Sequence, residues 1–326
     1  MTRVERFHPG TKVTNWASGS VVAPLPTTHI DYAGYSAGGT GPVNTTDKFS
    51  FPSDSRSTPS ALNLSSGRAY TSGCSNNSIF AYVAGGSDSF PTKVDIVDKF
   101  TFPEHVRTTL SSGLSSAMWD LGGTSNNGTA AYFFRQDQDV DKFAYSNDSR
   151  STLGTGRVQN GGSYSREGAA NGTTAGYFGG GTGGSGPTGY SRRIEKILYS
   201  NEVITNLSAY VFEYIAYMYG YSNSGTAAYF AGGSYYSSGW LVSNKYSKMA
   251  YSNETTSTLT ATLSSLRYEG QGMADSGVAG YSMGGSSATT VDKLTFSNDT
   301  SSALSTGLSA AMNRGAGYAH CEALAQ

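Results

Sequence analysis

The chain is poor in charge and in the residues that build metal sites or disulfide frameworks. Only 14% of its 326 residues are Asp, Glu, Lys or Arg, and the formal net charge is −1. Nothing in this balance attracts nucleic acid or an anionic membrane. The two cysteines, Cys74 and Cys321, are too few for a disulfide scaffold, and the four histidines lie at no metal-ligand spacing. We therefore expect no metal, no other cofactor and no nucleic-acid partner.

Long hydrophobic runs are missing too. No apolar segment reaches the ~18 residues that a membrane-spanning helix requires. The stretch from Met1 to His8 lacks the hydrophobic core of a secretory signal. The sequence thus predicts a protein without a membrane span, made in a cytoplasm and not exported by the usual route.

Glycine and aromatic residues, by contrast, are abundant. The chain has 42 glycines and 23 tyrosines, and aromatic residues make up 12% of it. Disordered chains are also polar, but they lack aromatics, so this composition favours packed β-strands.

A sequence motif built around Ala-Gly-Tyr-x-x-Gly-Gly recurs at intervals of about fifty residues. Short strand-like runs and turn signals lie between its copies. A repeat of this length and content predicts a β-propeller with one blade per repeat. The tyrosines of the six copies are Tyr35, Tyr82, Tyr132, Tyr177, Tyr229 and Tyr281.

Each repeat predicts four antiparallel strands, a to d. In the last repeat the run 279–285 is strand b, and 291–296 alternates apolar and polar residues as a half-buried strand c does. An acidic residue followed by lysine opens strand c, with Asn244-Lys245 as the one variant. We interpret these pairs, the tyrosines and the glycines as structural, because they recur in every unit. The pairs are Asp47-Lys48, Asp98-Lys99, Asp141-Lys142, Glu195-Lys196 and Asp292-Lys293.

The pattern resembles the kelch repeat, whose blade also carries a double glycine after its second strand. The resemblance covers residues 33–326. The third unit departs from it, with Arg135-Gln136 at that place, and leucine replaces the tryptophan usual in the fourth strand. The chain is therefore similar to a divergent kelch-like family, with repeats like those of bacteriophage and bacterial proteins. The matching double glycines are Gly38-Gly39, Gly85-Gly86, Gly180-Gly181, Gly232-Gly233 and Gly284-Gly285.

The two ends of the repeat region predict how the propeller closes. The stretch 313–321 matches the first-strand stretches 67–74 and 266–274, but no further strand follows it. It would complete the blade that begins at Ala33, which leaves no open sheet edge. We expect an all-β, six-bladed propeller over residues 31–326 and an extended arm over residues 1–30. Seven blades would require the arm to supply strands.

Binding residues are expected in the connections between strands b and c, which vary in length from unit to unit. The fourth and fifth are rich in Tyr, Ser and Gly with Trp or Arg, a composition typical of recognition surfaces. The alternative is that these loops only solubilise the surface. The candidates are Tyr190, Arg192, Arg193, Tyr235, Tyr236 and Trp240. Aromatic residues between Tyr210 and Tyr221 could stack on sugars, but one long strand a packed into the core is the favoured interpretation.

Catalysis finds little support in the sequence. No Gly-x-Ser-x-Gly nucleophile motif has a partner set, so we predict no catalytic residues and no enzyme. Asp137, Asp139 and Asp141 could offer calcium three carboxylates, but the rest of an ion-binding loop is missing.

Two functions remain open. The first is a structural or adhesion module of a bacteriophage virion, in a tail, baseplate or fibre, whose arm binds other virion proteins and whose loops contact a protein or a host glycan. The second is a bacterial carbohydrate- or protein-binding propeller outside any virus, located in the cytoplasm.

Overall fold

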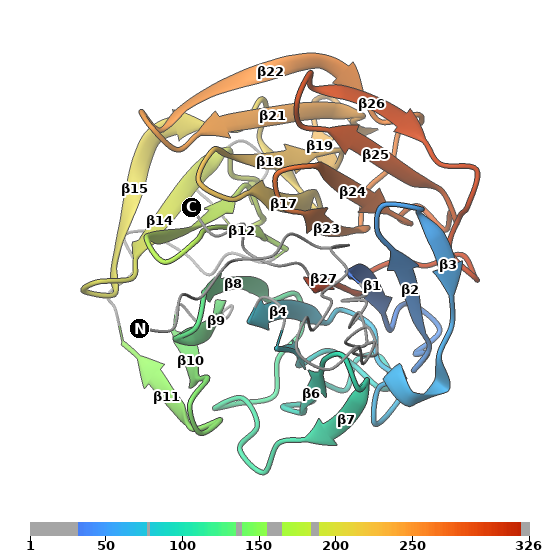
Figure 1. The fold of residues 1–326 in the computed structure, drawn as a ribbon. Helices are drawn as coiled ribbons and strands as arrows, with labels where there is room; N and C mark the ends of the chain where they lie inside the picture. The colour runs from blue at the N-terminus through green and yellow to red at the C-terminus, as the bar shows by residue number, and fades with distance from the viewer. Residues whose placement is uncertain (1–31, 77–78, 135–138, 155–164, 184–188, 321–326) are drawn as a thin grey trace, which may run out of the picture. The chain divides into compact units, whose positions relative to one another are not determined.

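The computed structural model describes residues 32–76, 79–134, 139–154, 165–183 and 189–320. Over these residues the chain forms six four-stranded antiparallel sheets and one three-stranded sheet, with a single helical turn, η1 (Ser60–Leu62). The predictions of an all-β fold and of four-stranded antiparallel units are therefore confirmed, and the architecture is propeller-like (Figure 1). No helix within these ranges is long and apolar enough to cross a bilayer.

The six larger sheets are numbered 1 to 6 here, and their strands are given in the order a to d. Sheet 1 is β27 (Ala316–His320), β1 (Ala33–Ala37), β2 (Thr46–Ser50) and β3 (Ser55–Ser57). Sheet 2 is β4 (Ser72–Asn76), β5 (Phe80–Ala84), β6 (Val97–Thr101) and β7 (Val106–Thr109). Sheet 3 is β8 (Gly122–Asn126), β9 (Ala130–Phe134), β10 (Val140–Ala144) and β11 (Arg150–Leu153).

Sheet 4 is β12 (Glu167–Asn171), β13 (Ala175–Gly179), β14 (Arg193–Leu198) and β15 (Val203–Tyr210). Sheet 5 is β17 (Tyr219–Asn223), β18 (Ala227–Ala231), β21 (Lys245–Ala250) and β22 (Thr255–Thr262). Sheet 6 is β23 (Gln271–Asp275), β24 (Ala279–Met283), β25 (Val291–Thr295) and β26 (Thr300–Ala303). The small sheet is β16 (Ile215–Ala216), β19 (Ser234–Tyr236) and β20 (Trp240–Val242).

Burial changes across each sheet from strand b to strand d. Every residue of strand b is buried in all six sheets, because neighbouring sheets cover both of its faces. Strand d of sheet 2, at Val106–Thr109, is exposed at every residue. The core therefore lies between the sheets.

Sheet 1 joins the two ends of the repeat region. Strand β27 pairs antiparallel with β1, and Tyr318 lies opposite Tyr35. The C-terminal strand thus supplies strand a of the sheet whose other strands begin at Ala33, as the sequence predicted. The arm predicted for residues 1–30 lies outside the described residues, and so do Arg135-Gln136, Asp137 and Cys321.

The strands a of successive sheets contact each other in the order β27, β4, β8, β12, β17 and β23, and β23 also contacts β27. Each carries a glycine at its second residue. A Cβ added to any of these glycines would come within 1.8 to 2.8 Å of the carbonyl oxygen of the same glycine in the preceding sheet. Only glycine fits such a close backbone approach. The six are Gly73, Gly123, Gly168, Gly220, Gly272 and Gly317.

The repeat tyrosine of strand b and the lysine of strand c together bind the c–d turn of the next sheet. Tyr281 Oη donates to one carboxylate oxygen of Asp54 at 2.7 Å, and Lys293 Nζ donates to the other at 2.6 Å. The acceptor occupies a turn position with positive φ. The same two donors bind one carboxylate at four other junctions, where they share an oxygen or take one each. They join Tyr82 and Lys99 to Asp148, Tyr132 and Lys142 to Glu202, Tyr177 and Lys196 to Glu254, and Tyr229 and Lys248 to Asp299.

The register corrects one assignment made from the sequence. Tyr229 lies opposite Lys248, so Ser247-Lys248 occupies the place of the acidic–lysine pair in sheet 5. The expected variant, Asn244-Lys245, lies three residues earlier. The assignment was wrong because serine takes the place of the acidic residue in sheet 5, so that the similar Asn-Lys pair three residues earlier matched the pattern better.

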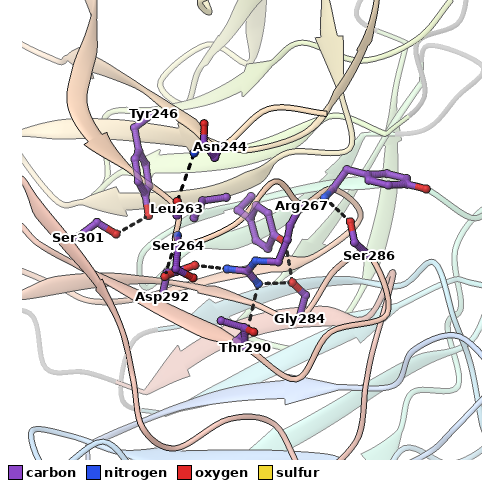
Figure 2. A network of polar contacts seen from close by, with 12 residues as sticks. Asn244, Tyr246, Leu263, Ser264, Arg267, Gly284, Ser286, Thr290, Asp292 and Ser301 are labelled. Carbon is purple, nitrogen blue, oxygen red and sulfur yellow. Dashed lines mark hydrogen bonds and ion pairs between the residues drawn. The ribbon is translucent and has the colours of Figure 1, made fainter. Parts of the chain in front are cut away.

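Buried arginines form a second set of contacts between strand c and the segment that precedes strand a. Arg267 is inaccessible to solvent and forms an ion pair with Asp292. Its other terminal nitrogen donates to the carbonyls of Gly284 and Thr290 (Figure 2). Arg68 pairs with Asp98 in the same way, at 2.6 Å.

The junction between sheets 1 and 2 differs from the other five. His105 stands where they have a carboxylate, and its Nε2 lies 3.1 Å from Tyr35 Oη. We expect His105→Asp to raise the free energy of unfolding by up to about 1 kcal/mol, because Tyr35 would gain a charged acceptor at a part-exposed site. Urea unfolding measures this. His105→Asn is the control without charge, and an Asp variant no more stable than the Asn variant would contradict the role given to the carboxylate.

Candidate ligand-binding site

Two residues before each strand a, the backbone adopts a positive φ of 53 to 63°. This conformation is uncommon for residues other than glycine. We call the six residues at this position the axial residues. They are Tyr70, Asp120, Ser165, Tyr217, Glu269 and Arg314.

Backbone hydrogen bonds link the axial residues in a cycle. The N–H of each donates to the carbonyl of the axial residue before it, and the N–H of Tyr70 donates to Arg314. The chain of bonds thus returns to its start, which holds six side chains from six sheets around one point. The other bonds are Asp120 to Tyr70 at 3.1 Å, Ser165 to Asp120 at 3.4 Å, Tyr217 to Ser165 at 3.3 Å, Glu269 to Tyr217 at 2.9 Å and Arg314 to Glu269 at 2.7 Å.

The double glycines of the repeat position these residues. The second glycine of each described pair donates its N–H to the carbonyl two residues before an axial residue, as Gly86 does to Met118 at 2.7 Å. Both glycines of this pair have positive φ, and a Cβ on Gly85 would lie 2.6 Å from the same carbonyl oxygen. The motif that identified the repeat is therefore part of the scaffold beneath the axial residues.

The axial residues surround a pocket of about 40 Å³. All six line it. The remaining lining residues lie one or two positions after an axial residue in the chain, and they are Thr71, Leu121, Arg166, Glu167, Gly270 and Gly315.

The charges around the pocket are unevenly paired. Arg314 forms an ion pair with Glu269, and its guanidinium lies 4.2 Å from the ring centre of Tyr70. Burial raises the pKa of Asp120 to about 6, although Arg314 and a hydrogen bond from Ser165 act in the opposite direction. Burial, and after it the charge of Asp120, raises the pKa of Glu167 well above its usual value. The two carboxyl groups therefore share a poorly solvated site.

Hydrogen-bonding capacity is left over in the pocket wall. Arg166 pairs with Glu195 through Nη1, but its Nε and Nη2 have no partner among the described residues. Thr71 Oγ1 has none there either. Only 3% of Arg166 and 7% of Thr71 are exposed. Buried polar groups without partners cost free energy, so donors here and acceptors on Asp120 and Glu167 favour a ligand with several hydroxyl groups.

An aromatic surface adjoins the pocket at Tyr70. The Tyr70 ring lies 5.8 Å from Trp119 and 6.3 Å from Phe90, and Phe90 stacks on Trp119 at 5.3 Å. Phe90 is 71% exposed. We call Tyr70, Phe90 and Trp119 the Phe90 platform.

A second aromatic surface stands on the small sheet. Tyr236 and Trp240 face each other across the hairpin β19–β20, and Trp240 is 65% exposed. The buried Tyr190 contacts Trp240 edge to face at 5.7 Å. Burial raises the pKa of Tyr190 to about 12, and the axial Tyr217 adds to this shift. We call Tyr190, Tyr236 and Trp240 the Trp240 platform.

The structure brings together three of the six predicted binding residues, Tyr190, Tyr236 and Trp240, in the Trp240 platform. Tyr235 pairs with Leu241 in the small sheet that carries the Trp240 platform. Arg192 lies instead against Tyr210 and Tyr214, at 4.5 and 5.0 Å from their ring centres, and Arg193 begins β14 opposite Tyr210.

The aromatic stretch from Tyr210 to Tyr221 is not the single strand a that was predicted. Tyr210 ends β15, β16 follows, and only Tyr219 and Tyr221 belong to strand a, where both are buried. Tyr217 has a φ of 59° and lines the pocket. The positive φ interrupts the strand and turns this one ring toward the site.

The carboxylates suggested as calcium ligands do not form a metal site among the described residues. Asp141 is fully buried, and its carboxylate accepts hydrogen bonds from Ser115 and Thr152. The described residues include no group of three or more His, Cys, Asp or Glu placed to hold a metal ion.

Comparisons with known proteins show the fold and nothing narrower. No family model and no curated protein matches the chain. Among solved structures, the one titled "Structure of YjhT" aligns with a TM-score of 0.66 at 14% identity, over 86% of this chain and 99% of that one. At this identity the likeness establishes a shared architecture alone.

Proposed function

We propose that this chain is a six-bladed, kelch-like β-propeller that acts as a non-enzymatic binding module and takes a glycan at the axial pocket. Two observations support the ring: strands a contact one another in a cycle, and the axial hydrogen bonds form a second cycle. Pairing of β27 with β1 supports closure through the C-terminal strand. A closed ring of repeated sheets leaves no long sheet edge exposed where the first and last sheets meet.

The pocket carries the functional part of the proposal. It combines buried donors on Arg166 and Thr71 with acceptors on Asp120 and Glu167, beside an exposed aromatic surface. Sugar hydroxyls both donate and accept, and the apolar face of a sugar ring packs on aromatic rings. A few convergent polar groups next to aromatic side chains are typical of small-molecule sites.

Glycan-array binding tests this assignment. We expect the wild-type protein to bind at least one glycan, and Asp120→Asn and Trp119→Ala to lower its affinity by about tenfold. Val106→Ala, on the exposed strand β7, is the matched control and should bind as the wild type does. Absence of glycan binding, or equal binding by the pocket variants, would overturn the assignment. Conversion of a bound glycan to product would contradict the non-enzymatic part.

The setting we propose is a bacteriophage virion, in a tail, baseplate or fibre, with the arm at residues 1–30 binding a neighbouring virion protein. Low charge and a composition rich in Gly, Ser, Thr, Asn and Tyr support an assembled particle, and so does the resemblance of the repeats to those of bacteriophage proteins. Deleting residues 1–30 should abolish incorporation into particles while the remaining chain stays folded. Normal incorporation of the truncated protein would favour the alternative, a bacterial binding propeller outside any virus.

A further inference from the structure

The two aromatic platforms extend from opposite members of the axial cycle. Tyr70 and Tyr217 are three places apart in a cycle of six. Arg314 lies between them, with its guanidinium 4.2 Å from the centre of the Tyr70 ring and 5.4 Å from that of Tyr217. The Phe90 platform and the Trp240 platform therefore flank the pocket on its two sides.

The same local backbone pairing lies at the base of both platforms. The residue before each axial tyrosine pairs with the residue after a double glycine: Ala69 bridges Ser87, and Ala216 pairs with Ser234. From these pairs the b–c connections run outward, one to Phe90 and the other to the hairpin that carries Tyr236 and Trp240. Because the two connections are equivalent parts of sheets 2 and 5, they lie on the same face as the pocket.

The pocket alone is too small to hold a sugar ring. A volume of about 40 Å³ has room for roughly two or three water molecules. Only hydroxyl groups enter it, so most of the contact area of a bound glycan must come from the aromatic surfaces beside it. Phe90 and Trp240, with more than half of each side chain exposed, offer that area on both sides.

We propose that the axial face binds a linear oligosaccharide of at least three sugar units, which crosses the pocket from the Phe90 platform to the Trp240 platform. The outer units pack on the two aromatic surfaces, and the central unit places hydroxyl groups into the pocket. This inference rests on the proposed glycan-binding function and adds the form of the ligand. It requires that affinity increases with chain length and depends on both platforms.

Series of oligosaccharides of increasing length, titrated against the full-length protein, test the inference. The probes are oligomers of one to six units of β-1,4-linked N-acetylglucosamine, β-1,4-linked glucose and α-1,4-linked glucose, together with O-antigen fragments of one to three repeats, titrated by calorimetry. For a series that binds, we expect affinity to rise by about a hundredfold between one and three or four units. Trp119→Ala and Trp240→Ala should each remove about a tenfold share of that rise.

A matched control lies next to Trp240 in β20. Leu241 is also exposed, but adjacent residues of a strand point to opposite faces. Leu241→Ala should therefore retain the full length dependence, and thermal unfolding of each variant shows whether it is folded. Fluorescence of Trp119→Phe and Trp240→Phe, each combined with Trp16→Phe, reports the other tryptophan separately, and a long oligomer should perturb both.

The outcomes separate the two claims. If a monosaccharide binds as tightly as its oligomers, or if Trp240→Ala is harmless, the spanning ligand is wrong while the pocket assignment stands. If no glycan of any length binds, in the oligosaccharide series or on the array, the proposed function fails and the inference fails with it.

Discussion

Replacing Gly272 with alanine should lower the free energy of unfolding by about 3 kcal/mol or more, or prevent folding altogether. The new Cβ would lie 2.1 Å from the carbonyl oxygen of Gly220, in the neighbouring strand a. Both sides of this contact are backbone, so no side-chain rotation relieves it. Strand β17 would have to move away from β23, which would disturb the axial hydrogen bonds of the residues that lie two positions before each of these strands.

Gly154→Ala is the matched control for this change. Within the described part of the chain, no heavy atom lies within 4 Å of a Cβ added to Gly154, and Gly154 does not need a positive φ. We expect its stability to change by less than about 0.5 kcal/mol in urea unfolding. Equal stability of the Gly272 and Gly154 variants would contradict the close packing of strands a.

Arg267→Met should cost about 3–5 kcal/mol, because it leaves the fully buried Asp292 carboxylate without its cation. The same change removes the donors to the carbonyls of Gly284 and Thr290 (Figure 2). The carbonyl of Arg267 belongs to the scaffold beneath Glu269, and Gly284 belongs to the glycine pair beneath Arg314. Glycan binding should therefore weaken together with stability.

Arg150→Met is the control that removes an arginine charge near a buried carboxylate at a part-exposed position. Arg150 lies 3.8 Å from the buried Asp141, but about a third of its side chain is exposed. We expect a loss below about 1 kcal/mol there. Replacing both partners, as Arg267→Met with Asp292→Leu, should recover part of the loss of the single change. A cost at Arg267 no larger than at Arg150 would contradict the importance of the buried pair.

Much of the scaffold was predictable because it repeats. The Ala-Gly-Tyr-x-x-Gly-Gly phrase located strand b in every sheet, and the match between the stretches at 67 and 313 predicted the pairing of β27 with β1. The assignment in sheet 5 failed because serine replaces the acidic residue there, at Ser247-Lys248, and a similar Asn-Lys pair lies three residues earlier. A repeated spacing fixes which segments are strands more firmly than which residues face each other.

The axial residues were missed because their chemistry does not repeat. The position is Tyr, Asp, Ser, Tyr, Glu and Arg in turn, and its shared property is a backbone conformation that the residue types do not disclose. A positional signal existed three residues later, at the glycine of strand a, as in Gly73 and Gly123. This glycine is required because the six strands a approach one another closely, and the sequence of a single repeat does not show that approach.

The loop residues were found by composition, and composition alone could not sort them. Trp240 and Tyr236 lie opposite each other on the hairpin β19–β20, whereas Arg192 packs against Tyr210, the last residue of β15. The difference arises from β16, a two-residue strand that pairs with β19 and is too short to be recognised from sequence.

The pH dependence of glycan binding tests the central claim, that the axial pocket is the binding site, most directly. The pKa of Asp120 is raised to about 6, so its carboxylate accepts hydrogen bonds from sugar hydroxyls above that pH and loses this ability as the pH falls through it. We predict that affinity, measured by calorimetry from about pH 5 to pH 8, drops on the acid side with a midpoint near 6, and that Asp120→Asn removes this step while remaining folded. A wild-type affinity that is constant across the range, or the same step in the Asp120→Asn variant, would contradict it.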